Sequence, residues 1–196
     1  MKFVLATSNP GKIREMREIL SESKIEIVTR EELGIELKVD ETGSTFLENA
    51  LLKAVAICEA SGMPAVSDDS GLMVEALNGE PGVYSSSFGG EDINDSDRCT
   101  YLLNVMKNVE QRSAKFVSNI VCAFPNGDTL TALGECHGKI AYTPQGSGGF
   151  GYDSVFIANG ADKTMAQLSR EDKNLVSHRG IALKNFALLL RERGIV

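Results

Sequence analysis

Histidine is scarce in this chain, tryptophan is absent, and no long apolar run occurs. The only histidines are His137 and His178, and no two cysteines form a C-x-x-C pair, so a zinc site is not expected. A transmembrane helix would need a run of about 18 apolar residues, and the N-terminus turns polar too early for a secretory signal. We therefore expect no membrane partner, a cytoplasmic location, and cysteines that are reduced and buried.

Basic residues are also in the minority. The chain has 20 Lys and Arg against 27 Asp and Glu, which gives a formal net charge of −7 at pH 7. Proteins that wrap nucleic acid normally carry a basic surface, so no nucleic-acid partner is expected. A small anionic ligand is still compatible with this charge, because a few focused cations or a metal ion can hold it against the overall field.

The hydrophobic pattern predicts an α/β fold. With 196 residues, 42% of them hydrophobic, the chain is long enough for one domain over residues 1–196, or two lobes sharing one core. It opens with an apolar strand at 2–6, a turn whose Asn9 and Pro10 suit a helix start, and a second strand at 25–28. The same periodicities predict the later elements. They are a helix ending near residue 61, a strand, acidic turn and strand over 64–77, a helix over 94–107, strands over 114–124, 129–141 and 154–158, and a last helix from about Ser177 to Arg193.

The segment SNPGK, residues 8–12, has the features of an anion-binding helix N-terminus. A strand that feeds a helix through a polar turn points backbone N–H groups outward, the helix dipole adds partial positive charge, and Lys12 adds a full charge. The alternative is an ordinary capped helix with a solvated lysine. A Walker A loop is excluded, because the G-x-x-x-x-G-K pattern is missing.

A glycine-rich turn, QGSGGFGYD, occupies residues 145–153. Gly146, Gly148 and Gly151 fit G-x-G-x-x-G, but a strand follows where a dinucleotide-binding site needs a helix, so a Rossmann site is excluded. Glycines would let the loop approach a ligand closely, with Phe150 or Tyr152 available to stack on a flat ring. A flexible hairpin loop is the alternative.

Basic residues lie at the start of the last predicted helix. Lys173 lies just before it, and His178 and Arg179 lie in its first turn. Positive charge in a first turn opposes the helix dipole, unless an anion or a carbonyl-rich ligand binds there. The alternative is surface charge placed by chance.

The acidic residues Glu41, Glu48, Asp68 and Asp69 supply hard oxygen ligands at predicted turns, which suit Mg²⁺. Neighbouring aspartates point in different directions, so one would face a site while the other caps backbone groups. An Asx-type turn is the alternative. Taken together, the acidic residues, the basic residues, the two glycine-containing turns and a possible stacking ring fit a Mg²⁺-bound nucleotide as ligand better than a sugar, a lipid or a peptide.

Seven short segments, in order over nearly the whole chain, match one family. They read ATSNPGK (6–12), ETGSTFLENALLKA (41–54), SDDSGL (67–72), PGVYS (81–85), GGFGYD (148–153), DKTMAQL (162–168) and SHRGIAL (177–183). On these motifs the sequence resembles the inosine triphosphate pyrophosphatases, also called dITP/XTP pyrophosphatases. It departs from them at Ser154, where the family usually has proline, and at Ser86-Ser87, where bacterial members often have Ala-Arg.

The resemblance implies a Mg²⁺-dependent hydrolase. It would split deaminated purine nucleoside triphosphates, ITP, dITP and XTP, into the monophosphate and pyrophosphate, and so cleanse the nucleotide pool. It also implies a homodimer, and an α/β fold of two lobes around a long, twisted, mixed β-sheet flanked by helices, with the active site in the cleft between the lobes.

The same resemblance assigns roles to individual residues. The triphosphate would be wrapped by Thr7, Ser8, Asn9, Pro10, Gly11 and Lys12, with Lys53 near the phosphates. Glu41 and Asp69 would hold Mg²⁺, and Asp69 would also accept the proton of the attacking water, while Ser70 touches the substrate. The base pocket would be lined by Phe150, Gly151, Tyr152 and Asp153, and the 6-oxo edge of the purine would be read by Lys173, His178 and Arg179.

Two other functions stay open at this point. A Maf-type pyrophosphatase for modified or pyrimidine nucleotides typically carries Ser-x-Ser-Pro-Arg-Arg in its opening loop, which SNPGK lacks. A non-catalytic nucleotide sensor would not need the acidic residues Glu41 and Asp69.

Overall fold

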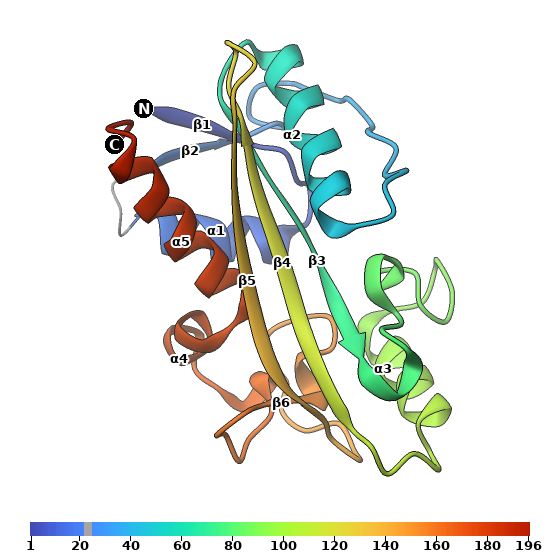
Figure 1. The fold of residues 1–196 in the computed structure, drawn as a ribbon. Coiled ribbons are helices and arrows are strands. Elements are labelled where there is room, and N and C mark those ends of the chain that lie inside the picture. The colour runs from blue at the N-terminus through green and yellow to red at the C-terminus, as the bar shows by residue number, and fades with distance from the viewer. Residues whose placement is uncertain (22–24) are drawn as a thin grey trace. The chain divides into compact units, whose positions relative to one another are not determined.

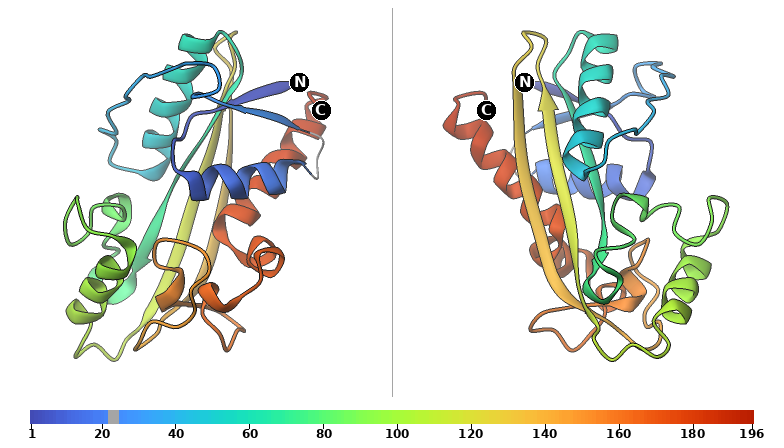
Figure 2. Two further views of the ribbon diagram at one scale, coloured as in Figure 1. Left: turned by 180° about the vertical axis from the view of Figure 1, so that it is seen from behind. Right: turned by 45° about the vertical axis from the view of Figure 1, so that its right-hand side comes forward.

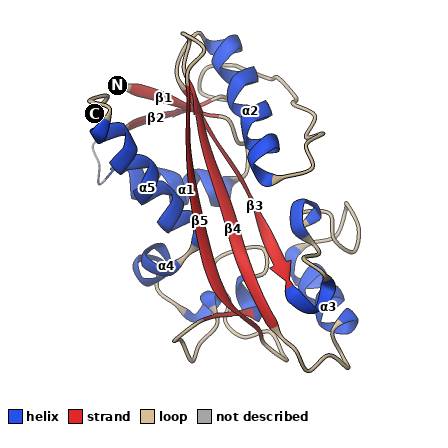
Figure 3. Ribbon diagram, in the orientation of Figure 1, coloured by secondary structure: helices blue, strands red, loops and turns tan. Residues whose placement is uncertain are grey.

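The computed structural model describes residues 1–21 and 25–196, which form a six-stranded sheet with helices on its faces (Figures 1 and 3). The strand order is β2-β1-β3-β4-β5-β6. Strand β1 runs parallel to β2 and to β3, and β5 runs antiparallel to β6, so the sheet is mixed. The strands are β1 Lys2–Leu5, β2 Glu26–Thr29, β3 Ala65–Val74, β4 Ser113–Ala123, β5 Thr129–Ile140 and β6 Phe156–Ala158. The helices are α1 Pro10–Ser21, α2 Phe46–Ser61, α3 Asp95–Val105, α4 Arg170–Val176 and α5 His178–Glu192.

The predicted α/β fold with a mixed sheet is therefore confirmed, and two local predictions need correction. Residues 65–74 form one continuous strand, where the sequence suggested a strand, an acidic turn and a second strand. Asp68 and Asp69 lie inside this strand because a lysine of a neighbouring helix pairs with each carboxylate. The charges can therefore be buried without being hydrated. Helix α4 was not expected. It is short, and Ser169 starts it by accepting a hydrogen bond from the N–H of Asp172.

The chain divides into two compact units. The first unit comprises residues 1–69, 118–134 and 179–196, and the second comprises residues 70–117 and 135–178. Strands β3, β4 and β5 each contribute residues to both units. Among the described residues, two hydrophobic clusters lie in the first unit and one lies in the second.

The first unit has a helix layer on each face of its strands. Phe3 and Leu5 of β1 pack with α1 and α5, whereas Val4 and Ala6 pack with α2. Successive side chains of a strand point to opposite faces, so the short apolar run at the start of the chain supplies the hydrophobic cluster on each face. Figure 2 shows α2 on one side of these strands, with α1 and α5 on the other.

The second unit packs the far part of β3 against α3 and β6. Leu72, Leu102, Met106 and Phe156 are all fully buried in this core. A buried arginine, Arg112, closes one end by donating to the backbone carbonyls of Met106, Ile140 and Ala141.

The cysteines are core residues, as expected from the sequence. Cys58, Cys99, Cys122 and Cys136 are all buried free thiols. Among the described residues, no helix is both long enough and apolar enough to cross a membrane.

We predict that the folded protein is inert to thiol reagents at pH 8. Burial raises the pKa of each of the four thiols, that of Cys136 to about 11, so little reactive thiolate forms. Ellman's reagent should release no colour from the native protein and should label four thiols per chain after unfolding in guanidinium. Rapid labelling of any thiol in the native protein would contradict this.

Candidate functional site

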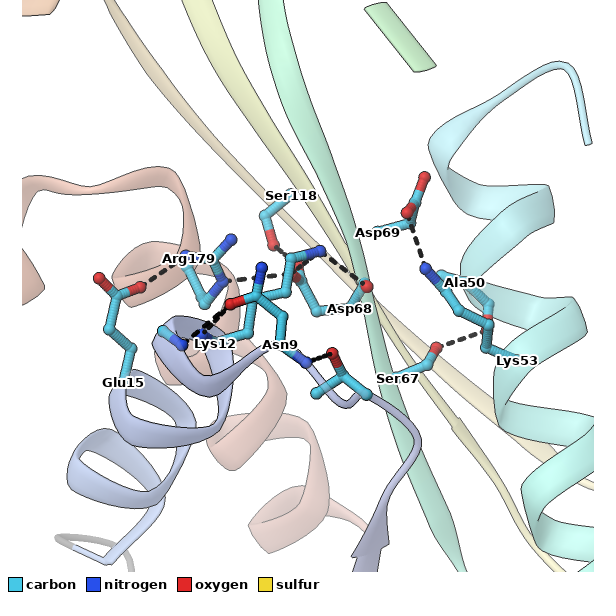
Figure 4. A network of polar contacts seen from close by, with 12 residues as sticks. Asn9, Lys12, Glu15, Ala50, Lys53, Ser67, Asp68, Asp69, Ser118 and Arg179 are labelled. Carbon is cyan, nitrogen blue, oxygen red and sulfur yellow. Dashed lines mark hydrogen bonds and ion pairs between the residues drawn. The ribbon is translucent and has the colours of Figure 1, made fainter. Parts of the chain in front are cut away.

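Strand β3 carries the two aspartates of the SDDSGL motif on opposite faces (Figure 4). Asp68 meets Lys12 of α1 and Arg179 of α5, on the face that packs with those helices. Asp69 meets Lys53 of α2 on the other face. The hydroxyl of Ser67, two residues before Asp69, donates to the carbonyl of Ala50 in α2 and so keeps the helix against the strand. The alternation of the strand thus turns two neighbouring acids toward two different sets of partners.

Asp68 is fully buried and held by three side chains. Its Oδ2 lies 2.9 Å from Lys12 Nζ and 3.2 Å from Arg179 Nε, and its Oδ1 accepts a hydrogen bond of 2.5 Å from Ser118 Oγ. Lys12 Nζ also donates to the backbone carbonyl of Asp68 at 3.2 Å. Burial alone would raise the pKa of Asp68, but the charges of Arg179 and Lys12 hold it well below its usual range.

Arg179 lies between two buried acids. Its Nη1 is 2.5 Å from Oε2 of Glu15, a residue of α1 that is 6% exposed. Burial alone would lower the pKa of Arg179. The negative charges of Asp68 and Glu15 outweigh this effect and raise the pKa above its ordinary value, so the guanidinium stays charged. Because Nε and Nη1 bind Asp68 and Glu15, this arrangement does not offer those two donors to the 6-oxo edge of a base, the role expected from the sequence.

The turn before α1 has the expected capping geometry. Asn9 Oδ1 accepts hydrogen bonds from the N–H groups of Gly11 at 2.9 Å and Lys12 at 3.1 Å. The N–H of Asn9 in turn donates to Thr7 Oγ1 at 3.2 Å. Ser8, Asn9 and Pro10 are exposed, so this helix N-terminus is open to a ligand.

Lys53 joins the two acids that the sequence assigned to a metal ion. Its Nζ lies 2.7 Å from Asp69 Oδ1 and 2.8 Å from Glu41 Oε2. Burial raises the pKa of Asp69 to about 6, against the lowering effect of Lys53. Burial would also raise the pKa of Glu41, but its hydrogen bond to Lys53 brings that pKa below the ordinary value.

This donor set fits a Mg²⁺ ion. Glu41 and Asp69 direct hard carboxylate oxygens at one cation, the ammonium of Lys53, so their spacing already suits a shared positive charge. Across residues 1–21 and 25–196, no cluster of three or more His, Cys, Asp or Glu side chains suits a metal. Two carboxylates suffice for Mg²⁺, which typically keeps waters and takes the remaining oxygens from phosphates.

The second unit holds a cation, an acid and a ring together. Asp153 Oδ2 accepts hydrogen bonds from Lys173 Nζ at 2.6 Å and from the N–H of Phe150 at 2.8 Å. Lys173 Nζ also lies 4.9 Å from the centroid of the Phe150 ring. The loop can close this tightly because position 149 is glycine, with φ of +72° and no room for a Cβ beside the Asp153 carboxylate.

Tyr152 and His178 are packed into the second unit. Tyr152 is 3% exposed, and its hydroxyl donates to the carbonyl of Ser85 at 2.8 Å. The ring of His178 stacks on Phe116, with centroids 4.6 Å apart and planes at 13°. Of the two rings considered for stacking on a ligand, only Phe150 is partly exposed, so it is the one the geometry favours.

The structure therefore sorts the expected site residues into two groups, one in each unit. The first unit contains Thr7, Ser8, Asn9, Pro10, Gly11, Lys12, Glu41, Lys53, Asp69 and Arg179. The second contains Ser70, Phe150, Gly151, Tyr152, Asp153, Lys173 and His178. Ser70 is half-buried on β3, and the N–H of Gly151 donates to Asp95 Oδ2 at 2.6 Å.

Three residues of these networks were not found from the sequence. Glu15 and Ser118 bind the Asp68–Arg179 pair, and Asn49 accepts a hydrogen bond from Gly43. Glu15 gave a weak signal, because it lies one turn after Lys12 and beside the apolar Met16 of α1. Ser118 gave none, since a serine in an apolar strand has no pattern that names its partner.

We predict that Asp68→Asn destabilises the protein by about 3–5 kcal/mol, because it removes the buried negative charge that balances Lys12 and, together with Glu15, balances Arg179. Urea unfolding of the variant and the wild type measures this loss. As the matched control, Lys2→Gln breaks the exposed Lys2–Glu26 ion pair and should cost less than about 1 kcal/mol. Equal midpoints for Asp68→Asn and wild type would refute the role given to the buried pair.

Known proteins resemble this chain over nearly its whole length. The model of the Ham1 family matches residues 3–188. A protein of Aquifex aeolicus named dITP/XTP pyrophosphatase is 48% identical over 200 positions and covers 97% of each chain. A protein of the same name from Thermus thermophilus is 47% identical, covering 94% of this chain and 89% of its own.

Solved structures agree with the sequence relatives. The Ham1 protein of Staphylococcus aureus superposes with a TM-score of 0.89 at 40% identity, covering 98% of this chain and 100% of its own. A HAM1 protein of Coxiella burnetii gives a TM-score of 0.90 at 38% identity, covering 98% and 99%. The resemblance that the seven motifs suggested is thus confirmed, and the chain belongs to the Ham1 family.

Proposed function

We propose that this protein hydrolyses deaminated purine nucleoside triphosphates, such as ITP, dITP and XTP, to the monophosphate and pyrophosphate. The relatives named dITP/XTP pyrophosphatase support this reaction. The single observation that carries it is the meeting of Glu41 and Asp69 at the ammonium of Lys53. It places an acid pair that suits a divalent ion beside a cation that suits a phosphate.

In this proposal the first unit binds the triphosphate. The exposed turn at residues 8–10 and the N-terminus of α1 offer backbone N–H groups to phosphate oxygens. Lys12 and Lys53 add two ammonium groups, one at each face of β3. Asn9 Oδ1 caps the helix, and this orients the side chain of Asn9. Its amide Nδ2 is the donor that it would offer to the phosphates.

Glu41 and Asp69 are the residues that would hold Mg²⁺. When bound there, the ion would neutralise phosphate charge and lower the pKa of a water. Asp69 is the proposed general base. Its carboxylate is oriented by Lys53 and takes the proton as a water oxygen attacks the α-phosphorus, while the bond to the leaving pyrophosphate breaks.

The second unit is proposed to bind the purine. Phe150 offers a ring face for stacking, and Lys173, fixed by Asp153, offers a donor beside it. The 6-oxo group of hypoxanthine or xanthine accepts a hydrogen bond, whereas the 6-amino group of adenine is itself a donor. Mismatched buried polar groups of this kind can discriminate by about 10⁴–10⁵-fold.

We expect the purified protein to release pyrophosphate from ITP, dITP and XTP with Mg²⁺, and to lose this activity when the ion is chelated. Coupled pyrophosphate detection over a panel that includes ATP, GTP, CTP and UTP measures it. Release mainly from the pyrimidine triphosphates would instead indicate a Maf-type activity. Tight nucleotide binding without any turnover would indicate a sensor.

Replacing Asp69 by Asn should lower kcat by about 10²–10⁴-fold, because the amide keeps the shape of the carboxylate but cannot accept the water proton. Steady-state kinetics on ITP, with circular dichroism to show that the variant is folded, measures this. Turnover at near the wild-type rate would show that Asp69 is not the base.

Two ring variants test the division of roles at the base. Phe150→Ala should weaken nucleotide binding by about 1–3 kcal/mol through lost stacking, seen as a higher KM. Tyr152→Phe keeps the buried ring and loses only the bond to the Ser85 carbonyl, so it should lower thermal stability and leave KM nearly unchanged. The opposite pattern would assign the stacking to Tyr152.

The homodimer, the cytoplasmic location and the lack of a nucleic-acid partner stay predictions. Size-exclusion chromatography with light scattering tests the first, and a salt-dependent gel shift with labelled DNA or RNA tests the third.

A further inference from the structure

Glu41 belongs to a segment without a regular element. Strand β2 ends at Thr29 and α2 begins at Phe46, and the fully described residues between them form turns and irregular backbone. A side chain on such a segment has access to many positions. A contact that fixes the backbone beside Glu41 would lower the entropy cost of its meeting with Lys53.

Asn49 provides that contact from the first turn of α2. It is 3% exposed, and its Oδ1 accepts a hydrogen bond of 2.7 Å from the N–H of Gly43, two residues after Glu41. Gly43 also lies directly against the helix. A Cβ at this position would come within 2.6 Å of the Glu48 Cβ and 2.7 Å of Asn49 Oδ1.

A second, separate contact holds the segment further along. Glu48 Oε2 accepts hydrogen bonds from the N–H groups of Ser44 at 2.7 Å and Thr45 at 3.1 Å, and the Thr45 hydroxyl caps α2 in return. This is a capping box, which stabilises the helix start. Of the two contacts, the one made by Asn49 is nearer to Glu41 in the chain.

The phase of α2 links Asn49 to the acid pair. Residues four apart in a helix share a face, so Asn49 lies one turn before Lys53 on the same side. That face presents the ammonium that meets the Glu41 carboxylate, and one turn earlier the amide that holds the N–H of Gly43. One helix face therefore contacts both the side chain of Glu41 and the backbone two residues after it.

We propose that Asn49 is a positioning residue for Glu41. By holding the N–H of Gly43 it keeps residues 41–43 against α2, so that the Glu41 carboxylate stays beside Asp69, where the pair would bind a divalent ion. The inference rests on the proposed function, because it deepens the metal-binding role of Glu41. It makes the affinity for the ion depend on a residue that need not touch the ion.

The test replaces Asn49 by Leu in the full chain, which keeps the branched shape of the side chain and removes the acceptor. Partners that orient metal ligands typically contribute 10–100-fold to affinity, so Mn²⁺ should bind the variant at least about tenfold more weakly in calorimetry or electron paramagnetic resonance. The Mg²⁺ concentration for half-maximal pyrophosphate release should rise similarly. At saturating Mg²⁺, kcat should return to the wild-type value.

Two control variants separate positioning from stability. Asn49→Asp keeps the acceptor for the Gly43 N–H and should retain Mn²⁺ affinity. Thr45→Ala removes the N-cap hydrogen bond of α2, so it should lower the melting temperature and leave Mn²⁺ affinity unchanged. If Asn49→Leu gives too little folded protein, Asn49→Ser removes the same contact with a smaller side chain.

Unchanged Mn²⁺ affinity in Asn49→Leu would overturn the proposal. A kcat that saturating Mg²⁺ does not restore would also overturn it, and so would an equal loss of affinity in Asn49→Asp or Thr45→Ala. The proposed function fails separately: a wild type that releases no pyrophosphate, while its Mn²⁺ binding still depends on Asn49, would remove the reaction and leave the positioning role in place.

Discussion

A fully buried carboxylate between two cations is the interaction on which the first unit depends. Asp68 binds Lys12 from α1 and Arg179 from α5, and Ser118 completes its hydrogen bonds from β4. Moving such charges out of water is costly, so they are stable only when each finds its partners in good geometry. Satisfying this one side chain therefore fixes where two helices lie against strand β3.

The same constraint positions the residues that are proposed to bind the triphosphate. Lys12 is drawn toward β3 at the first turn of α1, where the exposed turn at 8–10 leaves helix N–H groups open. Because β3 alternates, Asp69 faces the other way and meets Lys53 and Glu41. One strand thus carries an acid that organises the unit next to an acid that meets a single lysine, and the proposed reaction uses that division.

The second unit applies the same principle on a smaller scale. Asp153 and Lys173 are both buried and bind each other at 2.6 Å. Asp153 also accepts a hydrogen bond from the N–H of Phe150, so the glycine-rich loop holds a ring and a donor together. Groups fixed in this way before a ligand arrives lose less entropy when it binds, which is consistent with the proposal that this unit binds the purine.

The sequence by itself determined the α/β class, most element positions, the Asn9 cap, the buried cysteines and, through its motifs, the family. These features follow from local periodicity, capping chemistry and ordered spacing, which a chain carries without its partners. Only the tertiary structure decided that Asp68 and Asp69 lie within one strand, that Arg179 binds Glu15 and Asp68, that Tyr152 is packed away, and that Asn49 holds the turn beside Glu41. Each of these depends on which distant side chain supplies the opposite charge or the missing hydrogen bond, and no pattern along the chain specifies that partner.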